Sequence, residues 1–357
     1  MSTYDALSGL AVTVDDYVLE GLRADVSSGF ERLTTVVHLR GTGEEGVGED
    51  VVYDAADQRA LQAAGEAGRL PALAGDWALG DLCTHIDSLD LFDGAEPEHG
   101  DVSRLYRRWT FHSAALDLAL RQAGTTLHAA LGREPSPVTF VVSLRLGEPA
   151  TLAPLESRLA AYPTLRFKLD ATSSWTDDLV AELAATGAVD SVDFKALYRG
   201  TVVDSQPDGA LYRRVVAGFP DAWLEDPDVE NAEAAAALAD AHDRITWDAP
   251  IHSIADIEAL PFAPRMVNLK PSRIGGLERL CATYDYCAEH AIGAYGGGQF
   301  ELGPGRGQAQ YLASLFHPDA PNDIAPVGYN EPQPAAGLPP SPLPVSAEPT
   351  GFRWSGS

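Results

Sequence analysis

Basic residues are scarce in this sequence of 357 residues: lysine and arginine number 25 against 52 acidic residues, a formal charge of −27. Such a chain repels phosphate backbones and anionic lipid, so we expect no nucleic-acid partner and no membrane partner. Long apolar runs are missing as well, since none approaches the ~20 residues of a transmembrane helix. The first residues lack the basic start and apolar core of a signal peptide, which leads us to expect a cytoplasmic protein.

Motifs that would identify several other enzyme classes are absent. The three cysteines, Cys83, Cys281 and Cys287, have no metal-ligand spacing, and we interpret them as reduced, buried thiols. The nine histidines form no zinc-like pair, and no Gly-x-Ser-x-Gly nucleophile motif occurs. No dinucleotide-binding glycine fingerprint follows the first strand-like run, which disfavours a Rossmann domain.

The first 135 residues predict strands followed by helices. Residues 12–14, 35–40 and 47–53 are strand-like, and the glycine-rich stretch 41–46 predicts an antiparallel turn. Residues 55–67 and 102–131 have the apolar spacing of helices. This order predicts an α+β domain over residues 1–135.

From Val138 onward, strand-like runs recur about every 25 residues. The runs are 139–144, 165–169, 191–194, 222–225, 245–248 and 266–270, with helical stretches between them. This alternation predicts parallel strands joined by crossover helices, and we favour an α/β fold with a TIM-like (β/α)7β barrel over residues 136–325 to an open sheet. The proline-rich residues 326–357 are expected to pack back on the first domain as an extended strap.

Five of the six runs carry an ionisable residue at or near the carboxyl end, where buried parallel strands are normally apolar. These residues are Lys168, Asp193, Glu225, Asp248 and Lys270. In a barrel, the carboxyl ends of the strands converge on one mouth, where active sites are built. Because burying each charge singly would cost several kcal/mol, these groups must neutralise one another or bind an ion.

The three carboxylates offer the hard oxygen ligands that Mg²⁺ prefers, and the two lysines are candidates for proton transfer. Taken alone, each of the five residues also fits a turn, a helix cap or a solvated surface position. Their regular recurrence favours a shared site.

The sequence around the last three of these residues resembles the enolase superfamily, in particular its muconate-lactonizing and o-succinylbenzoate-synthase branch. The similar stretches are Trp223–Pro227, Thr246–Asp248 and Val267–Gly276, of which Asn-Leu-Lys-Pro-Ser-Arg-Ile-Gly-Gly is the most specific. Weaker similarity extends over about residues 30–325 and includes Arg166-Phe167-Lys168 and Asp193-Phe194-Lys195.

This resemblance implies an α+β capping domain over the barrel, with Mg²⁺, or alternatively Mn²⁺, as cofactor. Asp193, Glu225 and Asp248 would hold the metal, and Lys168 and Lys270 would be the acid/base residues. The implied reaction removes the α-proton of a small carboxylate substrate to give an enediolate, which a divalent cation stabilises. Relatives of this kind often form symmetric homo-oligomers, and capping-domain loops, here around residues 15–30 and 48–60, would select the substrate.

Departures from the family pattern add four candidate substrate-binding residues. Arg166 replaces the first lysine of a Lys-x-Lys strand and stays protonated, so we expect it to balance charge. Lys195 replaces an asparagine beside the first predicted ligand. Gly297 and Gly298 lie at the seventh-strand position, where backbone could approach a ligand, a plain turn being the alternative. With the acid/base lysines and the metal, Arg166 and Lys195 are expected to form a positive mouth that attracts an anionic substrate.

Within this branch we expect a lyase that eliminates water, as o-succinylbenzoate synthase does. A racemase or epimerase and a cycloisomerase are alternatives of the same branch. A third alternative is a catalytically silent barrel that binds a ligand or a partner, with Lys195 replacing the cation electrostatically.

Overall fold

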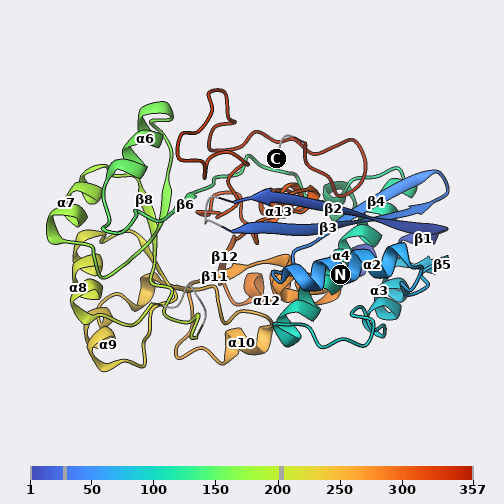
Figure 1. Cartoon of the computed structure of the whole chain (residues 1–357), viewed down its shortest axis with the longest axis horizontal. Coiled ribbons are helices and arrows are strands. Elements are labelled where there is room, and N and C mark those ends of the chain that lie inside the picture. The colour runs from blue at the N-terminus through green and yellow to red at the C-terminus, as the bar shows by residue number, and fades with distance from the viewer. Residues whose placement is uncertain (1, 27–29, 201–204, 356–357) are drawn as a thin grey trace.

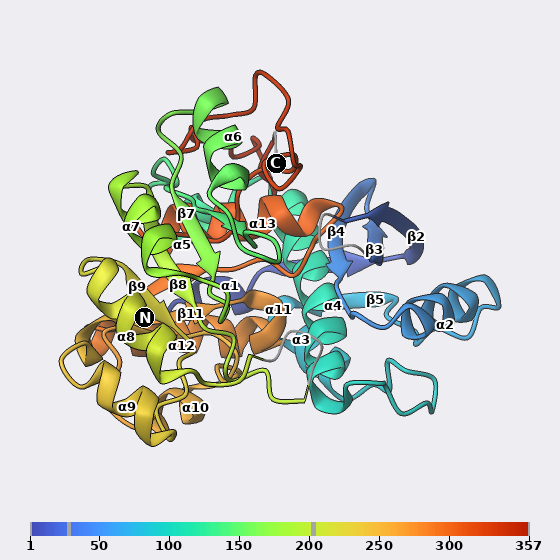
Figure 2. The same cartoon turned by 60° about the vertical axis from the view of Figure 1, so that its left-hand side comes forward.

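The computed structural model describes residues 2–26, 30–200 and 205–355. An N-terminal part with antiparallel sheets stands beside a curled, seven-stranded parallel sheet, in an α/β fold (Figure 1). Helix α4 (Gly100–Gln122) lies between these two parts in the second view (Figure 2). In the described ranges, no helix combines the length and apolar character needed to cross a bilayer.

The N-terminal part has two small antiparallel sheets, as its strand-like runs predicted. One contains β2 (Asp16–Asp25), β3 (Glu31–Gly41) and β4 (Glu44–Asp50), and the other pairs β1 (Ala11–Val14) with β5 (Gly75–Ala78). Its helices are α1 (Asp5–Ser8), α2 (Ala55–Glu66), α3 (Leu79–Asp87), α4 and α5 (Leu127–Leu131). The predicted turn lies between Gly41 and Glu44, which pair across β3 and β4.

Two N-terminal elements differ from expectation. Strand β2 lies where a loop was expected. The sequence pattern missed this strand because its alternation of exposed and half-buried residues is interrupted by two exposed residues, Glu20 and Gly21. The single helix expected over 102–131 is two helices, α4 and α5. Thr126 separates them, since its hydroxyl accepts the backbone N–H of Ala129 and begins a new helix.

The second part alternates strands and helices as predicted. Its strands are β6 (Val142–Leu144), β7 (Phe167–Asp170), β8 (Val189–Asp193), β9 (Trp223–Glu225), β10 (Ile245–Trp247), β11 (Met266–Leu269) and β12 (Gly293–Gly296). The helices are α6 (Ala153–Ala161), α7 (Asp177–Ala185), α8 (Gly209–Gly218), α9 (Ala232–Leu238), α10 (Ile254–Glu258), α11 (Pro271–Ile274), α12 (Leu277–Glu289) and α13 (Pro304–Phe316). The strands are parallel and lie in chain order, so all their carboxyl ends meet at one edge of the sheet.

The two edges of this sheet are linked by one short segment. Asn322 forms a parallel bridge with Phe140, which precedes β6, and Asp323 forms one with Gly297, which follows β12. The side chain of Asn322 is fully buried, accepts the backbone N–H of Gly296 and lies 2.7 Å from the Nδ1 atom of His317. These hydrogen bonds hold Asp323 at the carboxyl edge of the sheet.

Buried polar contacts join the N-terminal part to the sheet. The carboxylate of Glu49 accepts backbone N–H groups of Leu302 and Gly303, just before α13. The guanidinium group of Arg32 is fully buried and donates to the carbonyl oxygens of Val51 and Gln299. The contacts of Glu49 with Leu302 and Gly303, and of Arg32 with Gln299, pair buried charges with backbone that follows β12, so sliding one part against the other would break them.

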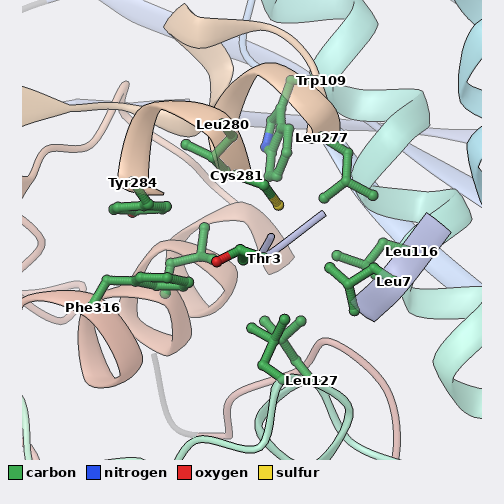
Figure 3. Close-up of a pocket in the computed structure, with 12 residues that line it drawn as sticks. Thr3, Leu7, Trp109, Leu116, Leu127, Leu277, Leu280, Cys281, Tyr284 and Phe316 are labelled. Carbon is green, nitrogen blue, oxygen red and sulfur yellow. The ribbon is translucent and has the colours of Figure 1, made fainter. Parts of the chain in front are cut away.

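Close packing at α4 explains one glycine of the predicted motif. Gly275 ends α11 with φ +76°, and a Cβ atom there would lie 2.6 Å from the Cβ of Leu105 on α4. A small apolar space of about 10 Å³ remains nearby, lined by α4, α12 and α13 side chains such as Trp109, Cys281 and Phe316 (Figure 3). It holds at most one water molecule.

The cysteines Cys83, Cys281 and Cys287 are buried and free, as predicted.

From Pro326 to Ser355 the chain has no helix and crosses both parts. The Nε atom of Arg353 pairs at 2.8 Å with the buried carboxylate of Asp117 on α4. Leu343 forms an antiparallel bridge with Val138, at the entry to the sheet. The domain boundaries expected from the sequence stay predictions.

We expect His317 to make stability depend on pH. Burial lowers the pKa of His317 from 6.5 to about 4, so between these values only the unfolded chain takes up the proton. Stability should be full above about pH 6.5 and fall by about 3 kcal/mol towards pH 4. Urea unfolding of His317→Gln at several pH values should show a shallower fall than the parent chain, and parallel pH curves would contradict this assignment.

Candidate active site at the carboxyl ends of the strands

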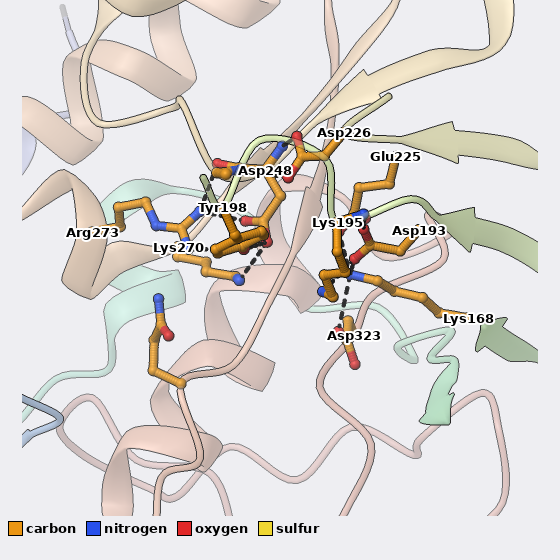
Figure 4. A network of polar contacts seen from close by, with 12 residues as sticks. Lys168, Asp193, Lys195, Tyr198, Glu225, Asp226, Asp248, Lys270, Arg273 and Asp323 are labelled. Carbon is orange, nitrogen blue, oxygen red and sulfur yellow. Dashed lines mark hydrogen bonds and ion pairs between the residues drawn. The ribbon is translucent and has the colours of Figure 1, made fainter. Parts of the chain in front are cut away.

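The carboxyl ends of the parallel strands bring the predicted charged residues together. Asp193 ends β8 and Glu225 ends β9, while Asp248 and Lys270 directly follow β10 and β11. Lys168 is the second residue of β7. All five side chains are buried and meet in one polar network (Figure 4).

Lys168 holds two of these carboxylates together. Its ammonium group forms ion pairs with Glu225 and, at 3.1 Å, with Asp193, and it lies 3.4 Å from the carboxylate of Asp323. Burial lowers the pKa of Lys168, but the three carboxylates outweigh burial and hold the pKa well above its ordinary value. The hydroxyl of Tyr295 donates to the second oxygen of Glu225. Both oxygens of Glu225 are therefore engaged.

Asp248 is held by a second set of contacts. It lies 2.8 Å from the Nζ atom of Lys270, pairs with the guanidinium group of Arg273, and accepts the hydroxyl of Tyr198 at 2.8 Å. Burial raises the pKa of Asp248, but Arg273 and Lys270 outweigh burial and hold the pKa well below its usual range. For Lys270, burial dominates over its partner Asp248 and lowers the pKa.

The carboxylates that lie close enough to share a metal include two of the three predicted ligands, Asp193 and Glu225. Oxygen atoms of Asp193, Glu225 and Asp226 lie within 4.8 Å of one another. Asp226 adopts a left-handed backbone conformation, with φ +47°, and accepts the backbone N–H groups of Asp248 and Ala249, each at 2.8 Å. Asp226 completes this group, while the predicted ligand Asp248 pairs with Lys270 and Arg273.

Neighbouring carboxylates in this group differ sharply in acidity. Burial raises the pKa of Asp226 to about 7, and the nearby Asp248 and Asp193 add to the shift. The pKa of Asp193 is lowered, because Lys195 and Lys168 outweigh its burial. Three buried carboxylates at this spacing are hard oxygen donors that suit a divalent cation such as Mg²⁺.

The two remaining cations predicted for the site have different positions. The ammonium group of Lys195 pairs with Asp193 and lies 3.7 Å from Asp170. Arg166, by contrast, precedes β7 and pairs with Asp190, with its side chain 40% exposed. Arg166 is therefore at the amino end of the strand, away from the network, and substrate binding by Arg166 stays a prediction that this position does not support.

Gly297 and Gly298 directly follow β12. A Cβ atom on Gly297 would lie 2.4 Å from Cε of Lys270 and 2.8 Å from the amide nitrogen of Asn268. Glycine at this position therefore leaves room for the lysine side chain. Contact of either glycine with substrate stays a prediction.

Six charged or tyrosine residues of the site were not assigned from the sequence: Asp226 and Arg273, which lie inside the similar stretches, and Asp170, Tyr198, Tyr295 and Asp323. Asp170 ends β7 in register with Asp193, so the same rule that singled out the other charged strand ends could have found it. Asp323 lies outside the regular strand spacing, and the tyrosines belong to no charge pattern. No feature of the sequence indicated these three.

The side chains of the network are by themselves close to neutral, so the expected positive mouth stays a prediction that depends on a bound metal. Ion pairs and hydrogen bonds join the carboxylates of Asp193, Glu225, Asp226, Asp248 and Asp323 to Lys168, Lys195, Lys270 and Arg273 or to neighbouring backbone (Figure 4). With these nine groups ionised, their formal charge is −1. A bound divalent cation would make the same site positive.

Two polar side chains beside the network lack partners. Both polar atoms of the Asn268 side chain and the hydroxyl of Ser191 are buried without a hydrogen bond among the described residues. Buried polar atoms are normally paired, so such atoms beside an ionic network are available to a bound ligand or water.

The chain matches a family known by its two domains of unknown function (DUF8230), the N-terminal domain over residues 5–130 and the C-terminal domain over residues 134–331. The chain belongs to this family. Its fold is similar to that of solved enolase-superfamily structures, as the resemblance seen in the sequence implied.

The similar solved structures include an enolase-superfamily protein from Listeria innocua, with a TM-score of 0.64, 18% identity and coverage of 88% of this chain and 86% of that one. A dipeptide epimerase from Methylococcus capsulatus, complexed with a Mg ion, has a TM-score of 0.60 and 20% identity, over 80% and 82% of the two chains.

Curated relatives match over shorter lengths. The o-succinylbenzoate synthase of Geobacillus stearothermophilus is 27% identical over 215 residues, 59% of this chain and 56% of the relative. That of Bacillus subtilis (strain 168) is 41% identical over 61 residues, 17% of this chain and 16% of the relative. The chain thus spans little more than half of one relative and about a sixth of the other.

Loss of Lys168 should destabilise the folded chain strongly. Lys168→Met leaves Asp193 and Glu225 facing each other without this cation, which we expect to cost about 3–5 kcal/mol of unfolding free energy. Adding Glu225→Gln should recover part of the loss. The measurement is urea unfolding at pH 7.5.

Arg265→Met is the matched control, since it also removes one positive charge. Arg265 is 67% exposed and pairs with Asp243 at the surface, so its loss should cost less than about 1 kcal/mol. Equal losses for Lys168→Met and this control would show that the network does not need Lys168.

Proposed function

We propose that this chain is a divalent-cation-dependent enzyme that removes the proton from the carbon next to a substrate carboxylate, giving an enediolate. The observation that carries this proposal is the convergence of two buried lysines, Lys168 and Lys270, with the carboxylates of Asp193, Glu225 and Asp226 at one edge of the sheet. The bridges of Asn322 and Asp323 to both sheet edges support a closed (β/α)7β barrel around this site.

The donor set fits a hard divalent cation. Asp193, Glu225 and Asp226 would hold it, and Asp248 is an additional candidate once it is released by Lys270 and Arg273. When bound, the cation would supply positive charge that stabilises the enediolate.

The lysines supply the proton-transfer groups. Lys168 extends from β7 and Lys270 follows β11, with three strands between them, so they approach the centre of the sheet edge from different sides. One can remove a proton and the other can donate one to a leaving group or return it to carbon. Asn268 and Ser191 offer unpaired polar atoms that could orient the substrate.

Among the reactions of this type we favour elimination of water. Both relatives described above are named o-succinylbenzoate synthase, and the motif around Lys270 resembles the same branch. Racemisation or epimerisation is supported by a 41% identical match over 63 residues to an N-succinylamino acid racemase from Amycolatopsis sp, and cycloisomerisation by the fold alone.

A silent barrel remains the second candidate, favoured by the ammonium group of Lys195 on Asp193. The two candidates differ in their response to Mg²⁺. An enzyme with this donor set should melt at a higher temperature in Mg²⁺, because a ligand at 100 times its Kd stabilises by about 2.7 kcal/mol. An unchanged melting temperature at millimolar Mg²⁺ would support the silent barrel.

Exchange of the α-proton tests the chemistry directly. A panel of acyl amino acids, dipeptides and cyclohexadiene carboxylates would be incubated with Mg²⁺ in deuterated water, and deuterium at the α-carbon measured by NMR. Lys270→Ala and Lys168→Ala should each slow exchange by about 10²–10⁴-fold. The Arg265→Met control should exchange at the parent rate. Full exchange by both lysine variants would refute the assigned roles.

A further inference from the structure

Lys195 contacts the carboxylate of Asp193, the first predicted metal ligand, from the loop that directly follows Asp193. Its backbone has φ +53°, which is uncommon for a residue with a side chain. Its backbone N–H donates to one oxygen of Asp193 at 2.9 Å, and its ammonium group contacts the other oxygen. A residue two positions away thus takes up both oxygens of Asp193.

A second carboxylate lies within reach of the same ammonium group. The nearer oxygen of Asp170 is 3.7 Å from Nζ of Lys195, and that oxygen is buried without a hydrogen bond among the described residues. The other oxygen of Asp170 accepts from Arg145 at 3.2 Å. Asp170 and Asp193 are register partners on β7 and β8, so rotation of the lysine side chain would suffice to change partners.

We propose that Lys195 is an exchangeable internal counter-cation: a divalent cation entering between Asp193, Glu225 and Asp226 displaces its ammonium group from Asp193 onto Asp170. This inference rests on the proposed function and adds to it the residue that controls loading of the metal site. No bond is made or broken and no proton is released, because the lysine stays protonated in both positions.

The positive charge of the Lys195 side chain determines the changes in metal affinity that we expect. The ammonium group in contact with Asp193 competes with any other cation there and repels it, so the metal must displace this contact to bind. Removing the charge with Lys195→Met should tighten metal binding on the order of tenfold or more. Asp170→Asn should weaken binding several-fold, because the displaced ammonium group loses its acceptor.

The test measures Mn²⁺ binding to the full chain, by the EPR signal of free Mn²⁺ at pH 7.5. The variants are Lys195→Met, Asp170→Asn and the double variant, with Arg265→Met as the control for net charge. We expect tighter binding in Lys195→Met and parent affinity in Arg265→Met. The effect of Asp170→Asn should largely vanish in the Lys195→Met background, since no ammonium group then needs the acceptor.

Other outcomes separate this inference from the proposed function. If the parent chain and Lys195→Met bind Mn²⁺ equally well, Lys195 does not compete and the inference is overturned, while the metal site stands. If neither binds Mn²⁺, the metal site and the proposed function both fail. Should Lys195→Met not fold, Asp170→Asn still decides, because parent affinity in that variant would overturn the exchange.

Discussion

The structure depends on the neutralisation of buried charges at the carboxyl ends of its parallel strands. Lys168 pairs with Asp193 and Glu225, while Asp248 pairs with Lys270 and Arg273. Each group alone would cost several kcal/mol to bury, so the strands that carry them must stay aligned for the charges to balance. The same alignment assembles the groups that the proposed chemistry needs.

The backbone around this network supports it. Three non-glycine residues that follow strands β8, β9 and β12, namely Lys195, Asp226 and Phe300, have positive φ values. Such conformations persist where surrounding contacts hold them, and they cluster at functional sites. Here they turn Lys195 back onto Asp193 and direct Asp226 towards the backbone that follows β10.

Much of this architecture could be predicted from the sequence, because parallel strands and their charged ends recur at regular spacing. The pattern located Lys168, Asp193, Glu225, Asp248 and Lys270 on one edge. It could not tell that Asp226 points inward beside Glu225, since that depends on a left-handed turn rather than on strand alternation. The spacing also could not place the side chain of Arg166. Arg166 lies two residues before Lys168, at the amino end of β7, and pairs with Asp190.

The most direct test of this account is the anomalous diffraction of crystals soaked in Mn²⁺. We predict one peak bounded by the carboxylates of Asp193, Glu225 and Asp226, with the ammonium group of Lys195 moved onto Asp170. The absence of a peak at these carboxylates, with Lys195 still paired to Asp193 at saturating Mn²⁺, would contradict the account and indicate a site neutralised by lysine alone.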